Sequence, residues 1–245
     1  MENNRANHEF ETTHWSVIVS SREDDSGIRR DSLGELCSAY WYPLFAFLRR
    51  KGHSPEEAAD YVQSFFMELI DKNFLEAVSP EKGRFRWFLK SAVGRYVAKQ
   101  KEKQRAQKRG GDRTIFSLNI DDAEQRYQLE PVDGWTADKL FDRRWALEVL
   151  QQALTRLREQ YESRGKLELY LALQPTLSGS PMSGEQYLEI SERFGMLEGA
   201  VKVSALRLRE KYRDAIGEIV AQTVVESDRV ADELDELLAA LGGKL

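Results

Sequence analysis

The sequence contains one cysteine, Cys37, and three histidines among 245 residues. A single thiol excludes a disulfide within one chain and any zinc site built from several cysteines. The histidines, His8, His14 and His53, lie in polar surroundings without metal-ligand spacing, and neither a glycine-rich phosphate loop nor a nucleophile elbow occurs. We therefore expect a protein that is not an enzyme and that uses no cofactor or metal.

Long apolar runs are also missing. The run YWYPLFAFL, residues 40–48, is too short to span a bilayer. No N-terminal stretch combines basic residues, an apolar segment and a small-residue cleavage site. We therefore expect a cytoplasmic protein with no membrane partner.

Acidic residues outnumber basic residues overall, and the positive charge is concentrated in one place. The chain has a formal net charge of −5. Residues 82–113 contain twelve Lys or Arg against Glu102 and Asp112, a net charge of +10, which leaves −15 for the remainder. Such an asymmetry indicates a polyanion partner for one face. The alternative is a solvated basic helix surface.

Apolar residues recur at helical spacing and strand-like alternation is almost absent, so we expect an all-helical fold. A first stripe, residues 33–47, contains Pro43, which should kink or split its helix. The next helix, residues 54–71, begins with a capping box of Ser54 and Glu57. Its apolar stripe leaves a second face that is free for a partner.

The basic stretch continues this helical pattern only as far as Val97. Residues 98–109 are predicted to continue the helix as a basic segment with nothing to bury, and their charges would repel one another unless a polyanion lay against them. Residues 111–138 are rich in carboxylates and have little periodicity, which predicts a flexible acidic linker. Helical periodicity resumes at Lys139.

A pair of helices follows in residues 183–216. Ser183 and Gln186 predict a second capping box, and Gly195 predicts a helix end. The helix after Gly195 carries apolar residues on one face and basic residues on the other. Two helices joined in this way predict a DNA-reading helix-turn-helix, and an ordinary helical hairpin is the alternative.

Three segments together resemble a known family. They are SPEEAADYVQSFF (54–66), GRFRWFLKSAVGRYVAKQKEKQRAQKR (83–109) and YLEISERFGMLEGAVKVSALRLREKYRDAI (187–216). Their order is similar to that of the extracytoplasmic-function (ECF) group of sigma-70-type RNA polymerase sigma factors, over residues 30–216. The resemblance implies a factor that binds core RNA polymerase and directs promoter recognition and transcription initiation. A free-standing helix-turn-helix regulator that binds an operator unaided is the alternative.

The resemblance also implies a domain order. The expected parts are an N-terminal extension (1–29), a region-2-like helical domain (30–110), the acidic linker (111–138), a region-4-like helix-turn-helix domain (139–216) and a C-terminal helical extension (217–245). The linker either runs through the RNA channel of the polymerase or is merely solvated. The extension is expected to pack on the second domain, with a docking site for a regulator as the alternative.

The site residues follow from the same resemblance. Polymerase binding is expected from Asp60, Gln63, Ser64 and Met67. Contacts to the minus-ten region are expected from Arg84, Arg86, Trp87, Lys90, Arg95, Lys99 and Lys103. Contacts to the minus-35 element are expected from Glu198, Lys202, Ser204, Arg207 and Arg209. A flipped base is held either by an aromatic side chain of the basic helix or by the loop at residues 73–82.

The sequence departs from the family pattern at three positions. Ala59 and Ser64 stand where acidic residues are usual, so the polymerase-binding face has lost charge. Phosphorylation of Ser64 would restore that charge, whereas a plain polar surface residue is the alternative. Leu197 stands where a Ser or Thr N-cap is usual. An anti-sigma factor and a protein kinase are therefore both kept as candidate partners.

Overall fold

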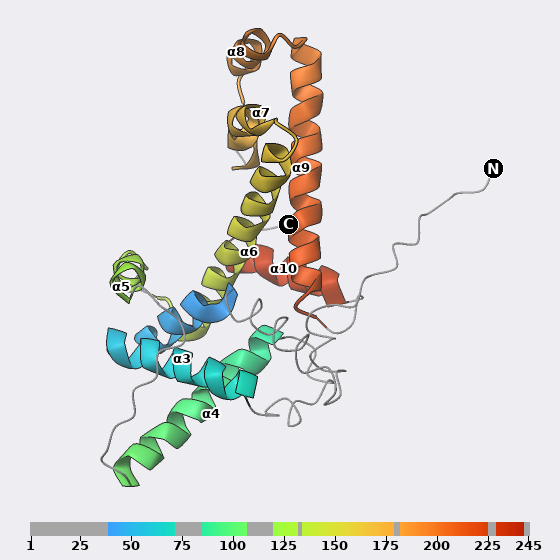
Figure 1. Cartoon of the computed structure of the whole chain (residues 1–245). Helices are drawn as coiled ribbons and strands as arrows, with labels where there is room; N and C mark the ends of the chain where they lie inside the picture. Colours follow the sequence, from blue (N-terminus) through green and yellow to red (C-terminus); the bar gives the residue numbers. More distant parts are fainter. Residues whose placement is uncertain are drawn as a thin grey trace, which may run out of the picture. The chain divides into compact units, whose positions relative to one another are not determined.

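The computed structural model describes residues 39–71, 85–106, 120–131, 134–178, 182–224 and 229–242. Within these residues all regular elements are helices, which confirms the all-helical prediction (Figure 1). Residues 39–50 are helical and are followed by α3 (Pro55–Asp71), α4 (Phe85–Ala106), α5 (Ile120–Gln128), α6 (Ala137–Glu162), α7 (Leu167–Leu173), the 3-10 helix η4 (Gln174–Leu177), α8 (Gly184–Phe194), α9 (Glu198–Ala221) and α10 (Val230–Ala240). No helix in these described ranges is both long and apolar enough to cross a membrane.

Two compact units divide the described residues. One contains the residues up to Leu147 and those from Ala221 onward, and the other contains Glu148 to Val220. The boundary therefore falls inside α6 rather than before it. The grouping differs from the expected domain order because the first turns of α6 and the C-terminal segment belong to the first unit.

Aromatic residues hold the first unit together. The ring centroids of Phe65 in α3 and Tyr96 in α4 lie 5.7 Å apart. Tyr40 meets Phe85 edge to face at 5.1 Å. Each of these side chains is at least nine-tenths buried, and full burial of a side chain of this size contributes about 1.5–3 kcal/mol. The helix over residues 39–50, α3 and α4 therefore share one core.

The start of α3 follows its local sequence. The backbone N–H of Glu57 donates to the Ser54 hydroxyl at 3.1 Å, and the Ser54 N–H donates to the Glu57 carboxylate at 3.1 Å. This reciprocal pair confirms the predicted capping box. The helix over residues 39–50 runs across Pro43 without a break, so the predicted split does not occur there.

The prediction of a flexible linker is wrong for residues 120–131. The helix α5 buries Ala123, and its Glu124 accepts two hydrogen bonds of 2.7 Å from the Arg49 guanidinium. Farther on, Glu130 is buried and accepts a hydrogen bond from the Tyr42 hydroxyl at 3.1 Å. These carboxylates have partners about eighty residues away in sequence, a pairing that local composition does not reveal. The rest of the expected linker, residues 111–119 and 132–133, lies outside the described residues.

The prediction that the C-terminal extension packs on the second domain is also wrong. The backbone N–H of Phe85 donates to the Thr223 carbonyl at 3.2 Å. In α10, Glu233 and Leu237 are buried, and Glu233 pairs with Arg86 of α4. The C-terminal segment therefore completes the first unit. The expected N-terminal extension lies outside the described residues.

Candidate nucleic-acid and protein interfaces

The second unit contains a helix-turn-helix formed by α8 and α9. The Ser183 side chain and Gln186 form the predicted capping box at the start of α8. At its end Gly195 has φ 61, in the left-handed region that favours glycine, and the Met196 N–H donates to the Ser191 carbonyl at 3.0 Å. Only two residues, Met196 and Leu197, separate this glycine from α9. The sharp turn therefore depends on Gly195, at which the sequence predicted the end of a helix.

A shared core fixes the angle between these two helices. Val201, Ala205 and Leu208 of α9 are fully buried, and they pack with Ile190 of α8. The remaining buried members of this cluster are Leu157, Tyr170 and Leu173. These positions in α9 recur every three or four residues, so they occupy one side of the helix and the opposite side is left to solvent.

The outer side of α9 carries the residues expected to contact the minus-35 element. Lys202, Arg207 and Arg209 are exposed. The Lys202 ammonium lies 2.6 Å from Glu198, and this hydrogen bond raises the pKa of Lys202. The Ser204 hydroxyl donates to the Ala200 carbonyl at 2.8 Å, so its proton already has an acceptor within the helix. Arg207 and Arg209 are therefore stronger candidates than Lys202 and Ser204 for contacts with DNA.

A basic hollow lies beside this face and was missed by the sequence interpretation. It has a volume of about 170 Å³ and is lined by four cationic residues, Arg164, Lys166, Arg207 and Lys211, together with Tyr161, Leu169 and Ser204. No carboxylate lines it. Four like charges around one hollow favour an anion such as a phosphate. The residues around Gly165 lie in a short turn, where helical periodicity gives no signal.

The exposed side of α3 carries the residues expected to bind polymerase. Asp60 and Ser64 are exposed, whereas Gln63 and Met67 are partly buried. Burial raises the pKa of Tyr96 in α4, and a hydrogen bond with Ser64 acts in the opposite direction. The Ser64 hydroxyl thus lies at the edge of the contact between α3 and α4. The predicted polymerase-binding side of α3 is therefore accessible in part, and Ser64 also contacts Tyr96 of the core.

The cations expected to contact the minus-ten region fall into two groups. Arg95, Lys99 and Lys103 are exposed along α4, and the Trp87 side chain is 50% exposed. In contrast, Arg86 is only 2% exposed and Lys90 is partly buried. Arg84, the loop at residues 73–82 and residues 107–113 of the basic stretch lie outside the described residues. Only part of the expected surface is therefore open to a ligand.

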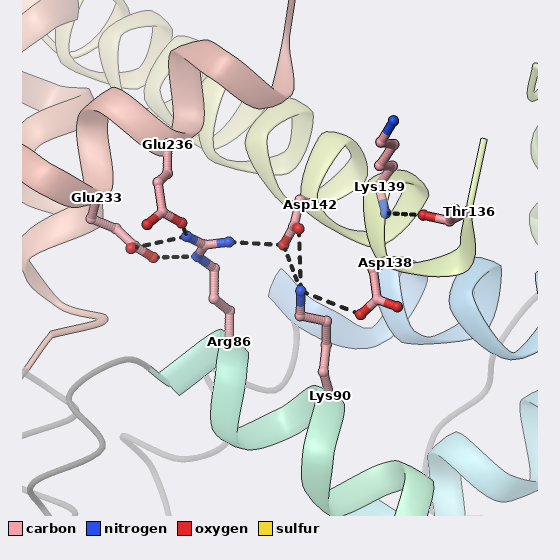
Figure 2. Close-up of polar contacts among 8 residues, drawn as sticks. All are labelled: Arg86, Lys90, Thr136, Asp138, Lys139, Asp142, Glu233 and Glu236. Carbon is pink, nitrogen blue, oxygen red and sulfur yellow. Dashed lines mark hydrogen bonds and ion pairs between the residues drawn. The ribbon is translucent and has the colours of Figure 1, made fainter. Parts of the chain in front are cut away.

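Arg86 lies at the centre of an ionic cluster in the first unit (Figure 2). Its Nε donates to Glu233 Oε1 at 2.5 Å and its Nη1 donates to Asp142 Oδ1 at 2.8 Å. Its Nη2 donates to Glu236 and, at 3.2 Å, to Glu233 Oε2. Lys90 contacts both Asp142 oxygens, at 3.1 and 3.2 Å. Arg86 is therefore not available to DNA in this arrangement, contrary to the expectation from sequence.

Burial lowers the pKa of the Arg86 guanidinium, but its hydrogen bonds to Glu233 and the charges of Glu233, Asp142 and Glu236 outweigh that effect. The pKa therefore lies above its ordinary value, and the group stays charged. The Arg86 Cζ also lies 4.6 Å from the centre of the buried Trp145 ring. Carboxylates from α6 and α10 thus hold the start of α4.

The described residues contain no group of three or more His, Cys, Asp or Glu side chains that could hold a metal ion. Their chemistry is that of contact surfaces: a cationic helix-turn-helix, a partly exposed basic helix and an acidic and polar helix face. An all-helical chain with these features falls in the class of DNA-binding transcription proteins.

The comparison with protein families identifies the particular family. The model of the ECF sigma factor family matches residues 45–218, more than two thirds of the chain. The chain therefore belongs to the ECF sigma factor family and is a sigma factor for transcription initiation, within a family of DNA-binding regulators that are not enzymes. No curated protein and no solved structure matches the chain.

Proposed function

We propose that this sigma factor binds core RNA polymerase through the outer side of α3 and recognises promoter DNA through α4 and α9. The observation that carries the proposal is the helix-turn-helix, in which α9 is packed through Val201, Ala205 and Leu208 and presents Lys202, Arg207 and Arg209 on its exposed side. Such a helix has the size and charge to enter the major groove. The exposed cations of α4 support a second DNA contact.

The test of DNA recognition is transcription by core polymerase reconstituted with this chain. Promoters are first identified by sequencing the transcripts that the holoenzyme makes from genomic DNA. Lys202→Ala and Arg207→Ala should then reduce initiation. A base contact should cost about 1–3 kcal/mol and relax preference at one position, whereas a phosphate contact should weaken all sequences alike.

Arg156→Ala, an exposed cation on α6, is the matched control and should leave initiation unchanged. Unaltered initiation in both α9 variants would refute the assignment of this helix. Tight, specific DNA binding in the absence of polymerase would instead favour the free-standing regulator.

The polymerase contact is tested by binding titrations with purified core polymerase. Asp60→Ala and Gln63→Ala should weaken binding while circular dichroism shows unchanged helicity, because neither side chain belongs to the buried stripe of α3. Glu159→Ala, an exposed acidic residue on α6, serves as the control. Unchanged affinity in both α3 variants would remove this face from the interface.

Ser64 is the candidate for regulation of the polymerase contact. It is exposed on α3, and a phosphate there would add about −1.5 to −2 charge beside Asp60 and Glu68, which lie four residues before and after it. Ser64→Asp should therefore bind core polymerase more tightly than the unmodified chain, and Ser64→Ala should not respond to a protein kinase. Ser91→Asp, at an exposed serine on α4, controls for added charge. Equal affinity of the unmodified chain and Ser64→Asp would exclude this switch.

A further inference from the structure

We propose that α10 is an internal competitor of nucleic acid: its carboxylates occupy Arg86 at the start of α4, and they must leave before Arg86 can bind a phosphate. The proposal concerns an autoinhibitory contact within the first unit and rests on the proposed DNA contact of α4. We call the six residues Arg86, Lys90, Asp138, Asp142, Glu233 and Glu236 the α4–α10 cluster (Figure 2).

The hydrogen-bonding capacity of Arg86 is nearly used up within this cluster. A guanidinium has five N–H donors. Four of its contacts go to three carboxylates, two of them on Glu233 and one each on Asp142 and Glu236. A bidentate phosphate contact needs two parallel N–H groups. Arg86 can therefore not bind a phosphate in this way while α10 is in place.

The charge of the cluster also opposes DNA. Its two cations face four carboxylates, because Lys90 contacts Asp138 at 3.6 Å as well as Asp142. On α10 itself, Asp232 and Asp235 are exposed in addition. Lys139 also lines the cavity beside Arg86 and Glu236, but the acids of this part of the first unit still outnumber its cations, so it repels a phosphate backbone. The remaining exposed cations of α4 begin at Arg95, three turns into the helix.

The contact between Arg86 and the α10 carboxylates is accessible to a competing anion such as a phosphate. The Glu236 side chain is 39% exposed, and the Asp142 side chain is 27% exposed. A cavity of about 560 Å³ opens beside them, lined by Arg86 and by residues of α6 and α10. Leu237 is the only fully buried apolar side chain of α10, whose other buried residue is Glu233. Charge therefore contributes a large share of the docking of α10, and such docking weakens as salt or a polyanion competes for it.

The experiment compares two double variants that remove the same charge from the same helix. Glu233→Gln with Glu236→Gln removes the two carboxylates that hold Arg86. Asp232→Asn with Asp235→Asn removes two exposed carboxylates of α10 that lie outside the α4–α10 cluster. The full chain is titrated without polymerase against a fluorescent single-stranded DNA oligonucleotide over a range of NaCl concentrations.

We expect the first pair to bind DNA about threefold to tenfold more tightly, with the slope of log K against log salt steeper by about 0.7, because one further phosphate contact forms on a single strand. The second pair should change affinity much less and leave the slope unchanged. In an Arg86→Gln background the first pair should give no gain, since the cation that it releases is missing.

With the double variants, three results would overturn the proposal. Equal gains from the two pairs would show general repulsion by α10 rather than a contact with Arg86. A lower melting temperature of the first pair with unchanged DNA affinity would show that the cluster only fastens the C-terminal segment. A gain that persists in the Arg86→Gln background would assign the effect to another cation.

A further variant covers the case in which the first pair does not fold. Leu237→Ala keeps every charge and loosens the docking of α10, so it should raise DNA affinity in the same direction, and an unchanged affinity would overturn the proposal. The outcome is separable from that of the proposed function. Unaltered transcription in the α9 variants refutes promoter reading by α9, whereas equal behaviour of the two double variants refutes only the role of α10.

Discussion

Leu197 shows how one residue sets the start of the recognition helix. Its carbonyl accepts the N–H groups of Ala200 at 2.8 Å and Val201 at 3.1 Å, so it occupies the N-cap position of α9. Its side chain has no oxygen to cap the free N–H groups that follow. The side chain is 82% exposed, so it also gains little from packing.

We therefore predict that Leu197→Ser stabilises the protein by about 0.5–2 kcal/mol, because the serine hydroxyl can accept a hydrogen bond from the first turn of α9. Urea or thermal unfolding measures the change. Leu197→Ala is the control, since it removes the same side chain without adding a cap. A stability of Leu197→Ser no higher than that of Leu197→Ala would show that the turn does not permit capping.

His53 is the one histidine among the residues that the structure describes, and histidine changes charge near neutral pH. It is 6% exposed, its ring meets Tyr61 edge to face, and Arg49 donates to its carbonyl. Burial lowers the pKa of His53 below its ordinary value, and the positive charge of Lys101 acts in the same direction. Glu57 opposes both effects, with its carboxylate 3.7 Å from Nδ1.

The sign of the pH dependence follows from this lowered pKa. Below the ordinary histidine pKa of about 6.5 the unfolded chain binds a proton that the folded chain resists, so stability falls as pH decreases through that range. His53→Gln should therefore lose stability less steeply between neutral pH and pH 5 than the unchanged chain. Denaturant unfolding at several pH values measures it. Parallel pH profiles of the two proteins would mean that His53 does not titrate differently on folding.

At the scale of elements, α4 is unusual because the helix extends beyond the part that packs into the core. Among the α4 side chains that the structure describes, which end at Lys103, the last buried one is Val97, yet the helix continues to Ala106. The described part of this extension contains Lys99, Lys101 and Lys103, all exposed, with Glu102 as the only acid among residues 98–103. Like charges at this spacing oppose helix formation. The extension therefore has a geometry that suits a polyanion better than solvent.

We predict that Lys99→Gln with Lys103→Gln weakens binding to non-specific duplex DNA more at low salt than at high salt. Each lost phosphate contact should reduce the salt slope by about one. Arg156→Gln with Arg158→Gln, an exposed pair on α6, removes the same charge and should leave the slope unchanged. Equal losses at every salt concentration would indicate that the two lysines act on the fold instead.

At the scale of the whole molecule, sequence patterns identified the structural features that are set by residues close together in sequence. The capping boxes at Ser54 and Ser183 and the turn at Gly195 each involve residues within a few positions, and all three occur as predicted. The family was also recognisable, because its motifs are contiguous segments.

Contacts between distant residues were not recognisable in this way. Glu124 bonds to Arg49 across 75 positions, so an acidic stretch that resembled a linker is a packed helix. Glu233 bonds to Arg86 across 147 positions, so a cation expected to contact DNA is buried. A charge run in sequence gives the sign of a segment but not the partner of each side chain. The expected surface of α4 was therefore too large.

The last prediction concerns Arg86 as the residue that joins three distant parts of the first unit. It connects α4 to Asp142 of α6 and to Glu233 of α10, and Glu233 is fully buried. Arg86 contacts both oxygens of this carboxylate, and removal of one partner from a buried ion pair typically costs about 3–5 kcal/mol. Arg86→Met should therefore destabilise the first unit by an amount in this range.

Lys90→Met is the matched control, because Lys90 binds the same Asp142 carboxylate but is more exposed, with 16% of its side chain accessible. It should cost well under half as much as Arg86→Met. Glu233→Gln in the Arg86→Met background should recover part of the loss, since it neutralises the carboxylate that the substitution leaves behind. Denaturant unfolding of the unchanged chain, Arg86→Met, Glu233→Gln and their double variant gives the coupling between the two residues. Equal costs for Arg86→Met and Lys90→Met, with no recovery in the double variant, would show that the buried carboxylate of Glu233 does not depend on Arg86.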